Sequence, residues 1–398
     1  MKEETISQKK KTWVKKRHAR TFAFLRAVLP PFLRLRYHYR AEPSGLKEGP
    51  YLILSNHQAS MDPFFLSASF PFPVYFFASD DIFNLKLSPL IRFLVNPIPK
   101  SKSLSDLQAV KDMVRVLKEG GSVGIFPEGN RTIDGGPWGF SDSVAKLVKL
   151  SGVPVVLYNL RGGYGTDPRW GHNIRRGDFY RGGVREVIYP EEYRALSNEA
   201  LYERLREGLT VDDPGSGHRY KSGRRAEYIE RALYLCPVCG GLSTLRSRKN
   251  RFVCQSCGRE AEYTEDLRIS PPFGDFDRIA PWYAWEREEI VKKVLAGGSV
   301  EDGDILFRES VKFQNKQKLP GDRVRMDRET LTVSGEGAES RYPLKKITAL
   351  TMVGKKKFNF YYEGRILQVK GSPRFCAIKY VHLFDGLRAA REREKEEV

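Results

Sequence analysis

A histidine and an aspartate stand five positions apart in the stretch LSNHQASMDP, residues 54–63. His57 and Asp62 follow the apolar run YLIL, which predicts a buried strand. Histidine titrates near neutral pH and can take a proton from a hydroxyl, while a carboxylate fixes its tautomer and stabilises the imidazolium. The pair could therefore activate an acceptor hydroxyl. A turn histidine beside an Asp62 that caps the next helix gives the same spacing, and for this pair alone that plainer interpretation is favoured.

Two further polar blocks make a general base the favoured interpretation of His57. FPEGNRT follows another apolar run and supplies Glu128, Gly129 and Arg131, while IPKSKS supplies Lys100 and Lys102. Glycine lets a ligand approach the backbone closely, and arginine offers a rigid fork for phosphate oxygens. Basic groups at the same sheet edge as the histidine indicate an anionic substrate beside a general base.

The elements that must position these blocks alternate along the chain. Short apolar runs predict strands at residues 51–54, 74–78, 122–126 and 153–158. Helical patterns lie between them, the clearest from Ser105 to Lys118. This alternation predicts an α/β fold with a mostly parallel sheet flanked by helices. Active sites of such sheets lie beyond the carboxyl ends of the strands, where the His-Asp turn and the PEGNRT loop both fall.

NHQASMD, IPKSKS, FPEGNRT and VPVVLYNL, in this order, resemble the four motif blocks of the glycerolipid acyltransferases, the lysophosphatidate acyltransferase (1-acylglycerol-3-phosphate acyltransferase) family. The resemblance covers roughly residues 20–210, about half of the chain. It implies an enzyme of phospholipid biosynthesis that transfers an acyl group from acyl-CoA to the free hydroxyl of a lysophosphatidate-type acceptor.

The family's functional residues can be carried over position by position. The resemblance implies that His57 is the general base, that Asp62 orients it, and that Pro154 belongs to the block associated with the acyl donor. The headgroup-binding block is matched by Glu128, Gly129 and Arg131. The second block usually carries arginine where Lys100 stands, and lysine keeps the charge but loses the bidentate fork.

Two alternatives stay open at this point. The acceptor could be glycerol-3-phosphate or another lysophospholipid, because the motifs fix the chemistry better than the headgroup. The chain could also be a catalytically inactive adaptor that binds lipid or nucleic acid. The presence of the whole polar set argues against an inactive protein, and nucleic acid is not expected as a partner.

The net charge of +19 is concentrated at the start of the chain, where residues 1–40 hold twelve Lys/Arg and two Glu. We expect residues 1–45 to form a basic amphipathic arm that associates with an anionic membrane surface. The alternative is a helix packed on its own domain. No run of 18 apolar residues predicts a transmembrane helix, so the expected location is cytoplasmic and peripheral on the membrane.

Four of the five cysteines form two Cys-x-x-Cys-Gly units, with 14 residues between Cys239 and Cys254, and Cys376 stands alone. Four thiolates suit tetrahedral zinc (Zn2+), so a structural zinc ribbon is predicted. A closed site of four cysteines leaves no open coordination position, and no catalysis is assigned to it. The expected ligands are Cys236, Cys239, Cys254 and Cys257.

The rest of the chain divides by composition. The acyltransferase domain is expected at 46–212, a linker at 213–232, the ribbon at 233–262, a linker and helix at 263–298, and a β-rich domain at 299–398. The element order of that last domain, many short strands closed by one helix, resembles a pleckstrin-homology (PH) or GRAM-like barrel. Its basic turn VGKKKFNFYY could dock an anionic headgroup or could equally be a solvated hairpin.

Overall fold

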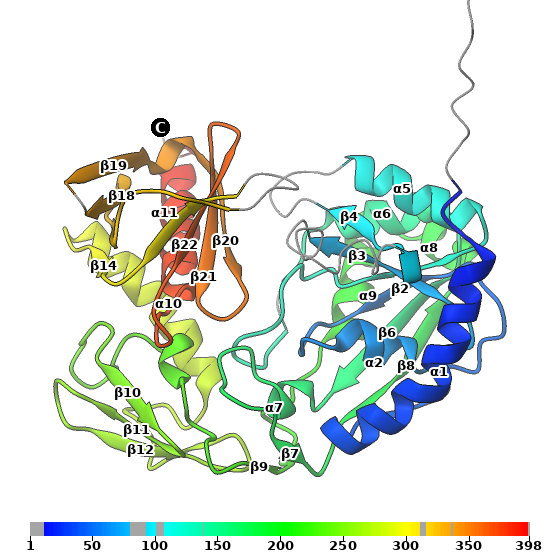
Figure 1. The fold of residues 1–398 in the computed structure, drawn as a ribbon, viewed down its shortest axis with the longest axis horizontal. Helices are drawn as coiled ribbons and strands as arrows, with labels where there is room; N and C mark the ends of the chain where they lie inside the picture. The colour runs from blue at the N-terminus through cyan, green and yellow to red at the C-terminus, as the bar shows by residue number, and fades with distance from the viewer. Residues whose placement is uncertain are drawn as a thin grey trace, which may run out of the picture.

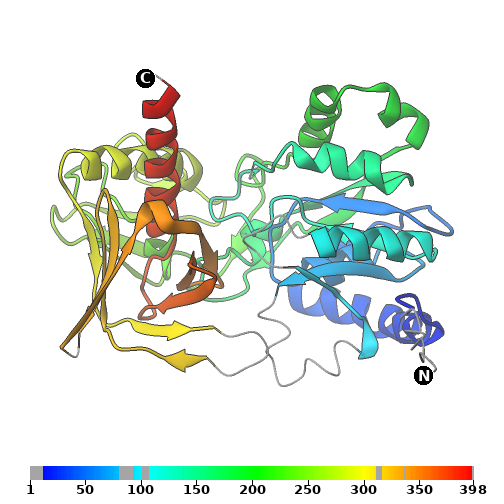
Figure 2. The ribbon, with the colours of Figure 1, turned by 90° about the horizontal axis from the view of Figure 1, so that it is seen from above.

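The computed structural model describes three units that lie against one another (Figures 1 and 2). They are an α/β unit, a small cysteine unit and a β-rich C-terminal domain. The residues described are 12–79, 93–100, 107–137, 139–310, 316–335 and 337–396. Residues 1–11 of the expected arm, Lys102 and Ser105 lie outside them.

The α/β unit is built on a seven-stranded sheet with the order β1-β8-β6-β2-β5-β3-β4. The strands are β1 (Arg40–Ala41), β2 (Leu52–Ser55), β3 (Val74–Ser79), β4 (Ile98–Lys100), β5 (Ser122–Ile125), β6 (Val155–Arg161) and β8 (Arg181–Ile188). Every neighbouring pair is parallel except β6 and β8. The expected α/β fold with a mostly parallel sheet is confirmed.

Helices cover both faces of this sheet because its strands are apolar on both sides. In β2, Leu52 and Leu54 point to one hydrophobic cluster and Ile53 points to the other. The first face is covered by α5 (Leu107–Lys118), α6 (Ser143–Ser151), α8 (Pro190–Ala195) and α9 (Asn198–Leu209). The second face is covered by α1 (Lys16–Tyr37) and α2 (Asp62–Ser67).

The two remaining units are mainly antiparallel sheets. The cysteine unit has β10 (Leu245–Arg248), β11 (Arg251–Cys254), β12 (Glu260–Tyr263) and β13 (Ile269–Ser270). The C-terminal domain pairs the sheet β14-β17-β18-β19 with the sheet β16-β15-β22-β21-β20. Its strands are β14 (Val300–Asp302), β15 (Leu306–Glu309), β16 (Gln317–Lys318), β17 (Arg323–Met326), β18 (Thr330–Gly335), β19 (Ala338–Pro343), β20 (Ile347–Val353), β21 (Lys357–Tyr362) and β22 (Arg365–Lys370).

Two long helices, α10 (Ile279–Leu295) and α11 (Ile378–Glu396), pack beside these sheets. A β-rich C-terminal domain with a closing helix is therefore confirmed. Its closer resemblance to a PH or GRAM domain stays a prediction.

The segment 213–232, expected to be a linker, is packed into the protein. It carries β9 (Tyr220–Lys221), which pairs with β7 (Arg176–Gly177), and the 3-10 turn η1 (Ile229–Arg231). Tyr220 and Ile229 are fully buried in a cluster that runs from the α/β unit through the cysteine unit to the C-terminal domain. The glycine and polar residues of this segment mark turns rather than exposure, which composition cannot distinguish. One hydrophobic cluster consequently joins the three units, while the α/β sheet keeps two clusters of its own.

Over the described part of the chain, the search for a bilayer-crossing helix finds none with the necessary length and apolar character.

Candidate active site

The turn after β2 places His57 and Asp62 in contact. The Nδ1 atom of His57 lies 2.8 Å from Oδ2 of Asp62. With its proton on Nδ1, the imidazole donates to the carboxylate and keeps the lone pair of Nε2. The ring stacks on Phe126 with 4.3 Å between centroids, and the His57 side chain is 19 % exposed. One ring nitrogen of a mostly buried histidine is thus available to a substrate hydroxyl.

The Asp62 carboxylate is fully buried and faces this turn. Its Oδ2 accepts the backbone N–H groups of Gln58 and Ala59 at 2.6 and 2.9 Å, and the Tyr180 hydroxyl donates to Oδ1 at 3.3 Å. Asp62 is the first residue of α2, but the donors of these bonds lie outside the helix. Asp62 therefore orients the histidine and the turn rather than capping the helix.

The PEGNRT loop lies directly against the His-Asp turn. Leu54 of β2 pairs with Ile125 of β5 in parallel register, so the two loops leave the sheet at the same edge. The Thr132 N–H donates to the His57 carbonyl at 2.9 Å. The Glu128 carboxyl accepts a hydrogen bond from the His57 backbone amide. Two hydrogen bonds therefore hold the loop to the main chain of His57, one to its carbonyl and one from its amide.

A cavity of about 430 Å³ opens between these two loops. His57, Glu128, Gly129 and Arg131 all line it, and so does Lys100 at the end of β4. The φ angle of Gly129 is +68°, a left-handed conformation that glycine adopts without strain. The structure thus brings the expected base and the expected headgroup-binding residues into one cleft, while their chemical roles stay predictions.

Burial sets the protonation state of His57. Removal from water lowers the pKa of the imidazole, and the hydrogen bond and charge of Asp62 partly oppose this effect. Arg131 and Arg169 lower the pKa further. The net direction is downward from the usual value near 6.5. The ring is consequently neutral at pH 7, the state that a general base requires.

Glu128 is held in its neutral form by the same environment. Burial raises the pKa of its carboxyl to about 9, although the bond from the His57 amide works in the opposite direction. Its Oε2 atom is buried and has no hydrogen-bond partner among the described residues. A protonated carboxyl in this position can donate a hydrogen bond to an oxygen of an anionic substrate.

Of the other residues predicted to bind substrate, Lys100 lines the cavity and Pro154 does not. Lys100 lies in the cavity wall, with its Nζ 5.8 Å from the centroid of the Phe77 ring. Pro154 is not brought to the site. Its carbonyl accepts the Leu52 N–H at the start of β2, and the parallel register of β2 and β6 puts it at the edge opposite His57. Pro154 therefore does not line this cavity, because the start and the end of a parallel strand lie at opposite edges of a sheet, and its association with the acyl donor stays a prediction.

Two residues that the sequence analysis missed contact Arg131, and one of them, Arg169, also lines the cavity. Asp167 and Arg169 follow the short helix α7 (Gly163–Thr166), beyond the carboxyl end of β6. Asp167 Oδ2 lies 3.6 Å from Nη1 of Arg131, and Arg169 Nη1 donates to the Arg131 carbonyl at 3.2 Å. No local motif marks them, and their position after a strand of the same sheet was the one available signal.

The cysteine unit brings its four thiols together. The Sγ atoms of Cys236, Cys239, Cys254 and Cys257 all lie within 4.8 Å of one another. Two of the distances are 3.9 and 3.7 Å, close to the separation of about 3.8 Å that Zn–S bonds of about 2.3 Å impose in a tetrahedron. Gly240 and Gly258 follow the second cysteine of each pair with φ of +70° and +72°, so both turns are knuckles of the same shape. The donors fit a divalent metal.

Among the comparisons with known proteins, one family model matches within the α/β unit. Residues 36–158 match the model of the family described as Acyltransferase. The His-Asp turn and the PEGNRT loop both lie inside that range. This part of the chain is therefore an acyltransferase-family domain.

Curated relatives of this chain are named as 1-acyl-sn-glycerol-3-phosphate acyltransferases. The chain is 29 % identical over 122 residues to the 1-acyl-sn-glycerol-3-phosphate acyltransferase of Borreliella burgdorferi, covering 28 % of this chain and 47 % of that protein. It is 26 % identical over 194 residues to the chloroplastic 1-acyl-sn-glycerol-3-phosphate acyltransferase BAT2 of Brassica napus, covering 46 % and 55 %. The chain thus spans about half the length of these relatives.

Among solved structures, the 1-acyl-sn-glycerophosphate acyltransferase PlsC of Thermotoga maritima is similar over 48 % of this chain and 76 % of that one. Its identity is 21 % and its TM-score 0.40.

Proposed function

We propose that the protein transfers an acyl group from acyl-CoA to the free hydroxyl of a lysophosphatidate-type acceptor. The observation that carries this proposal is the His57–Asp62 pair in one cavity with Arg131 and Glu128. The family match and the names of the relatives support the same reaction.

The residues of the cavity suffice for the steps of this reaction. Nε2 of His57 takes the proton of the acceptor hydroxyl while the oxygen attacks the thioester carbonyl. The C–S bond of the resulting tetrahedral species breaks, an oxygen ester remains, and the CoA thiolate takes the proton back from the imidazolium. Asp62 stabilises the imidazolium in between. Arg131 binds the phosphate of the acceptor, and the protonated Glu128 donates to an oxygen of its glycerol phosphate headgroup.

The release of free CoA thiol tests this proposal. The purified full chain would receive acyl-CoA with 1-acyl-glycerol-3-phosphate, glycerol-3-phosphate or a lysophosphatidylcholine, in detergent and on vesicles. We expect the fastest release with 1-acyl-glycerol-3-phosphate. Arg131→Ala should raise the KM for that acceptor about tenfold or more, because it removes a charge-assisted contact. An unchanged KM would point to another headgroup.

The main alternative, an inactive lipid-binding adaptor, predicts a different result from the same assay. It predicts no thiol release with any acceptor under either condition. The complete set of polar residues in the cavity favours the enzyme.

We further propose that α1 places the protein on the cytoplasmic surface of an anionic membrane. Phe24, Val28, Phe32 and Leu35 form a stripe along this helix, and their exposures are 67 %, 52 %, 49 % and 82 %. Arg34 and Arg36 lie in its last turn. An exposed apolar stripe beside basic residues is typical of interfacial helices.

Co-sedimentation with anionic vesicles tests the membrane proposal. The double variant Phe24→Ser with Leu35→Ser should bind at least severalfold more weakly, because it removes apolar surface without touching the core. Leu150→Ser, at a 58 % exposed position on α6, is the matched control. Equal binding of all three proteins would remove α1 as the contact.

We also propose that the four-cysteine cluster holds one structural Zn2+. The thiol separations and the paired knuckles support it. Metal analysis of the purified chain should give about one zinc per molecule.

A further inference from the structure

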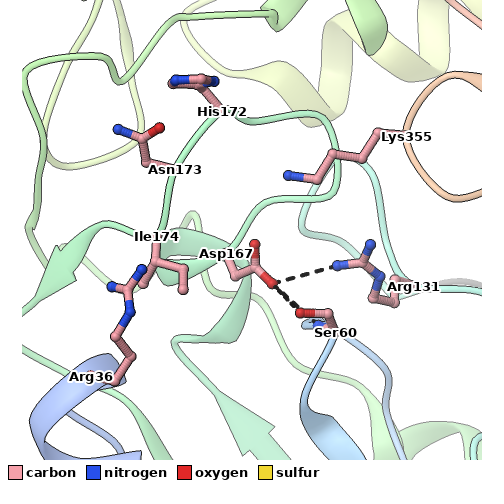
Figure 3. Close-up of a pocket in the computed structure, with 8 residues that line it drawn as sticks. All are labelled: Arg36, Ser60, Arg131, Asp167, His172, Asn173, Ile174 and Lys355. Atoms are coloured by element: carbon pink, nitrogen blue, oxygen red, sulfur yellow. Dashed lines mark hydrogen bonds and ion pairs between the residues drawn. The ribbon is translucent and has the colours of Figure 1, made fainter. Parts of the chain in front are cut away.

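A second cavity of about 490 Å³ lies beside the His57 cleft (Figure 3). It is formed by side chains from five separate parts of the chain, one of which is the segment 167–174. Arg36 comes from α1, Arg131 and Ser60 come from the two catalytic loops, and Lys355 comes from the turn between β20 and β21 of the C-terminal domain. Figure 3 shows the Lys355 side chain extending from the C-terminal hairpin into the cavity that Arg131 and Asp167 also line.

The charges around this second cavity do not balance. Arg36, Arg131 and Lys355 contribute three cations, and Asp167 contributes one carboxylate. Asp167 Oδ2 is already engaged, because it accepts from the Ser60 hydroxyl at 2.8 Å and faces Arg131 at 3.6 Å. Two positive charges remain. A phosphate monoester carries nearly two negative charges at neutral pH, so it is the group that fits.

Lys355 is fixed in position rather than mobile in solvent. Its Nζ donates to the carbonyl of Gly171 at 2.6 Å, which leaves two of its three N–H donors for a ligand. Burial lowers the pKa of Lys355, Asp167 raises it, and Arg131 lowers it further. A bound anion would therefore supply counter-charge that the Lys355 ammonium group lacks.

The buried Arg169 holds the turn that carries Lys355 against the PEGNRT loop. Its Nε and Nη2 atoms donate to the carbonyls of Gly354 and Met352 at 3.1 and 3.0 Å. Its Nη1 donates to the carbonyl of Arg131. One guanidinium therefore joins the C-terminal hairpin to the PEGNRT loop, and this fixes the distance between Lys355 and Arg131.

The two cavities are continuous in their walls. Both are lined by Ser60 and Arg131, and the His57 cleft also contacts Thr351 and Gly354 of the hairpin. A single substrate can consequently present its reacting group at His57 and its phosphate to the second cavity.

We propose that this second cavity binds the phosphate monoester of a substrate, and that Lys355 of the C-terminal domain is a specificity-determining residue of the site. The assignment to a substrate rests on the proposed acyl transfer. The acceptor is the source that the shared wall with Arg131 favours, and the 3′-phosphate of CoA is the other source of the same group.

Steady-state kinetics of the full chain test the proposal. Lys355→Met should raise the KM for 1-acyl-glycerol-3-phosphate about tenfold and change kcat less than twofold, because a binding contact is lost and the base is intact. Lys355→Arg should restore most of the affinity. The matched control is Lys356→Met, one position further along the turn and not part of either cavity wall. Arg36→Met tests the same cavity from α1 and should raise the same KM.

The donor is tested in parallel by comparing acyl-CoA with its 3′-dephospho form. If wild-type protein prefers acyl-CoA, and Lys355→Met removes that preference with the acceptor KM unchanged, the cavity holds the donor's phosphate. If neither KM responds to Lys355→Met or Arg36→Met, the proposal is overturned.

A binding measurement separates this proposal from the acyl transfer itself. Inorganic phosphate should raise the melting temperature of wild-type protein and of Lys356→Met, and should do so much less for Lys355→Met. That pattern in a protein with no acyl transfer activity would refute the proposed function and keep the phosphate site. Equal shifts in all three proteins would refute the phosphate site.

Discussion

The cysteine cluster and the His57 cavity show two opposite ways of building a polar site. Each cysteine pair is held by its own tight turn. Gly240 and Gly258 donate their N–H groups to the backbone carbonyls of Cys236 and Cys254, each at 2.9 Å. The cluster closes on itself, and none of its four cysteines lines the His57 cavity or the second cavity. The His57 cavity instead draws its groups from loops more than 70 residues apart.

The two sites also differ in what their polar groups lack. In the His57 cavity a carboxyl oxygen of Glu128 is buried without a partner, and its pKa is raised to about 9. Such unfavourable burial is typical of sites prepared for a ligand. The cysteine cluster has the complete donor set that one metal needs. This difference favours a chemical role for the first site and a structural role for the second.

The sharpest test of this difference is His57→Ala. It should lower kcat about 1,000-fold, because the proton of the acceptor hydroxyl loses its base. The melting temperature should stay within a few degrees, since His57 belongs to neither hydrophobic cluster of the α/β sheet.

The matched control is His218→Ala. His218 also faces a carboxylate, with Nδ1 3.4 Å from Asp178, but it lies outside the His57 cavity. It should keep full activity. Near wild-type turnover of His57→Ala would show that another group is the base.

The opposite pattern is expected when the cysteine cluster is broken. Cys239→Ser, or removal of the metal by a chelator, should lower the melting temperature by about 10 °C or more, because the small unit cannot hold its shape without the metal. Its core is continuous with that of the other units, so the loss should spread.

Thermal unfolding followed by circular dichroism measures this effect. Ser256→Ala, at an exposed position of the other knuckle, is the control and should melt like wild type. If Cys239→Ser melts like wild type and binds no zinc, the cluster has no structural role.

A smaller effect is expected from Glu128→Gln. The pKa of Glu128 is raised to about 9, so its carboxyl is neutral at pH 7 and becomes charged as the pH passes 9. The negative charge then repels the phosphate of the acceptor, and the KM of wild-type protein should rise severalfold between pH 7.5 and pH 10. The Gln variant cannot ionise, and its KM should stay nearly flat. A similar rise in both proteins would assign the pH dependence to another group.

Much of the fold could be predicted because it depends on local patterns. Apolar runs placed β2, β3, β5 and β6 within a few residues of their observed positions. The alternation of strands and helices gave the parallel sheet, since few topologies satisfy it. The cysteine spacing likewise predicted a cluster that the structure assembles. Composition misjudged the segment 213–232, because turn residues occur in packed loops as well as in linkers.

The sequence by itself determined which chemistry is present, through His57, Asp62, Glu128 and Arg131 at the ends of predicted strands. Local spacing could do this because parallel strands deliver their carboxyl ends to one edge. The tertiary structure alone decided that Pro154 lies at the other edge and that Lys355 stands beside the site. The position of Pro154 depends on the register of the strands, and the position of Lys355 depends on the docking of a domain more than 200 residues away from Arg131. No local sequence pattern encodes either.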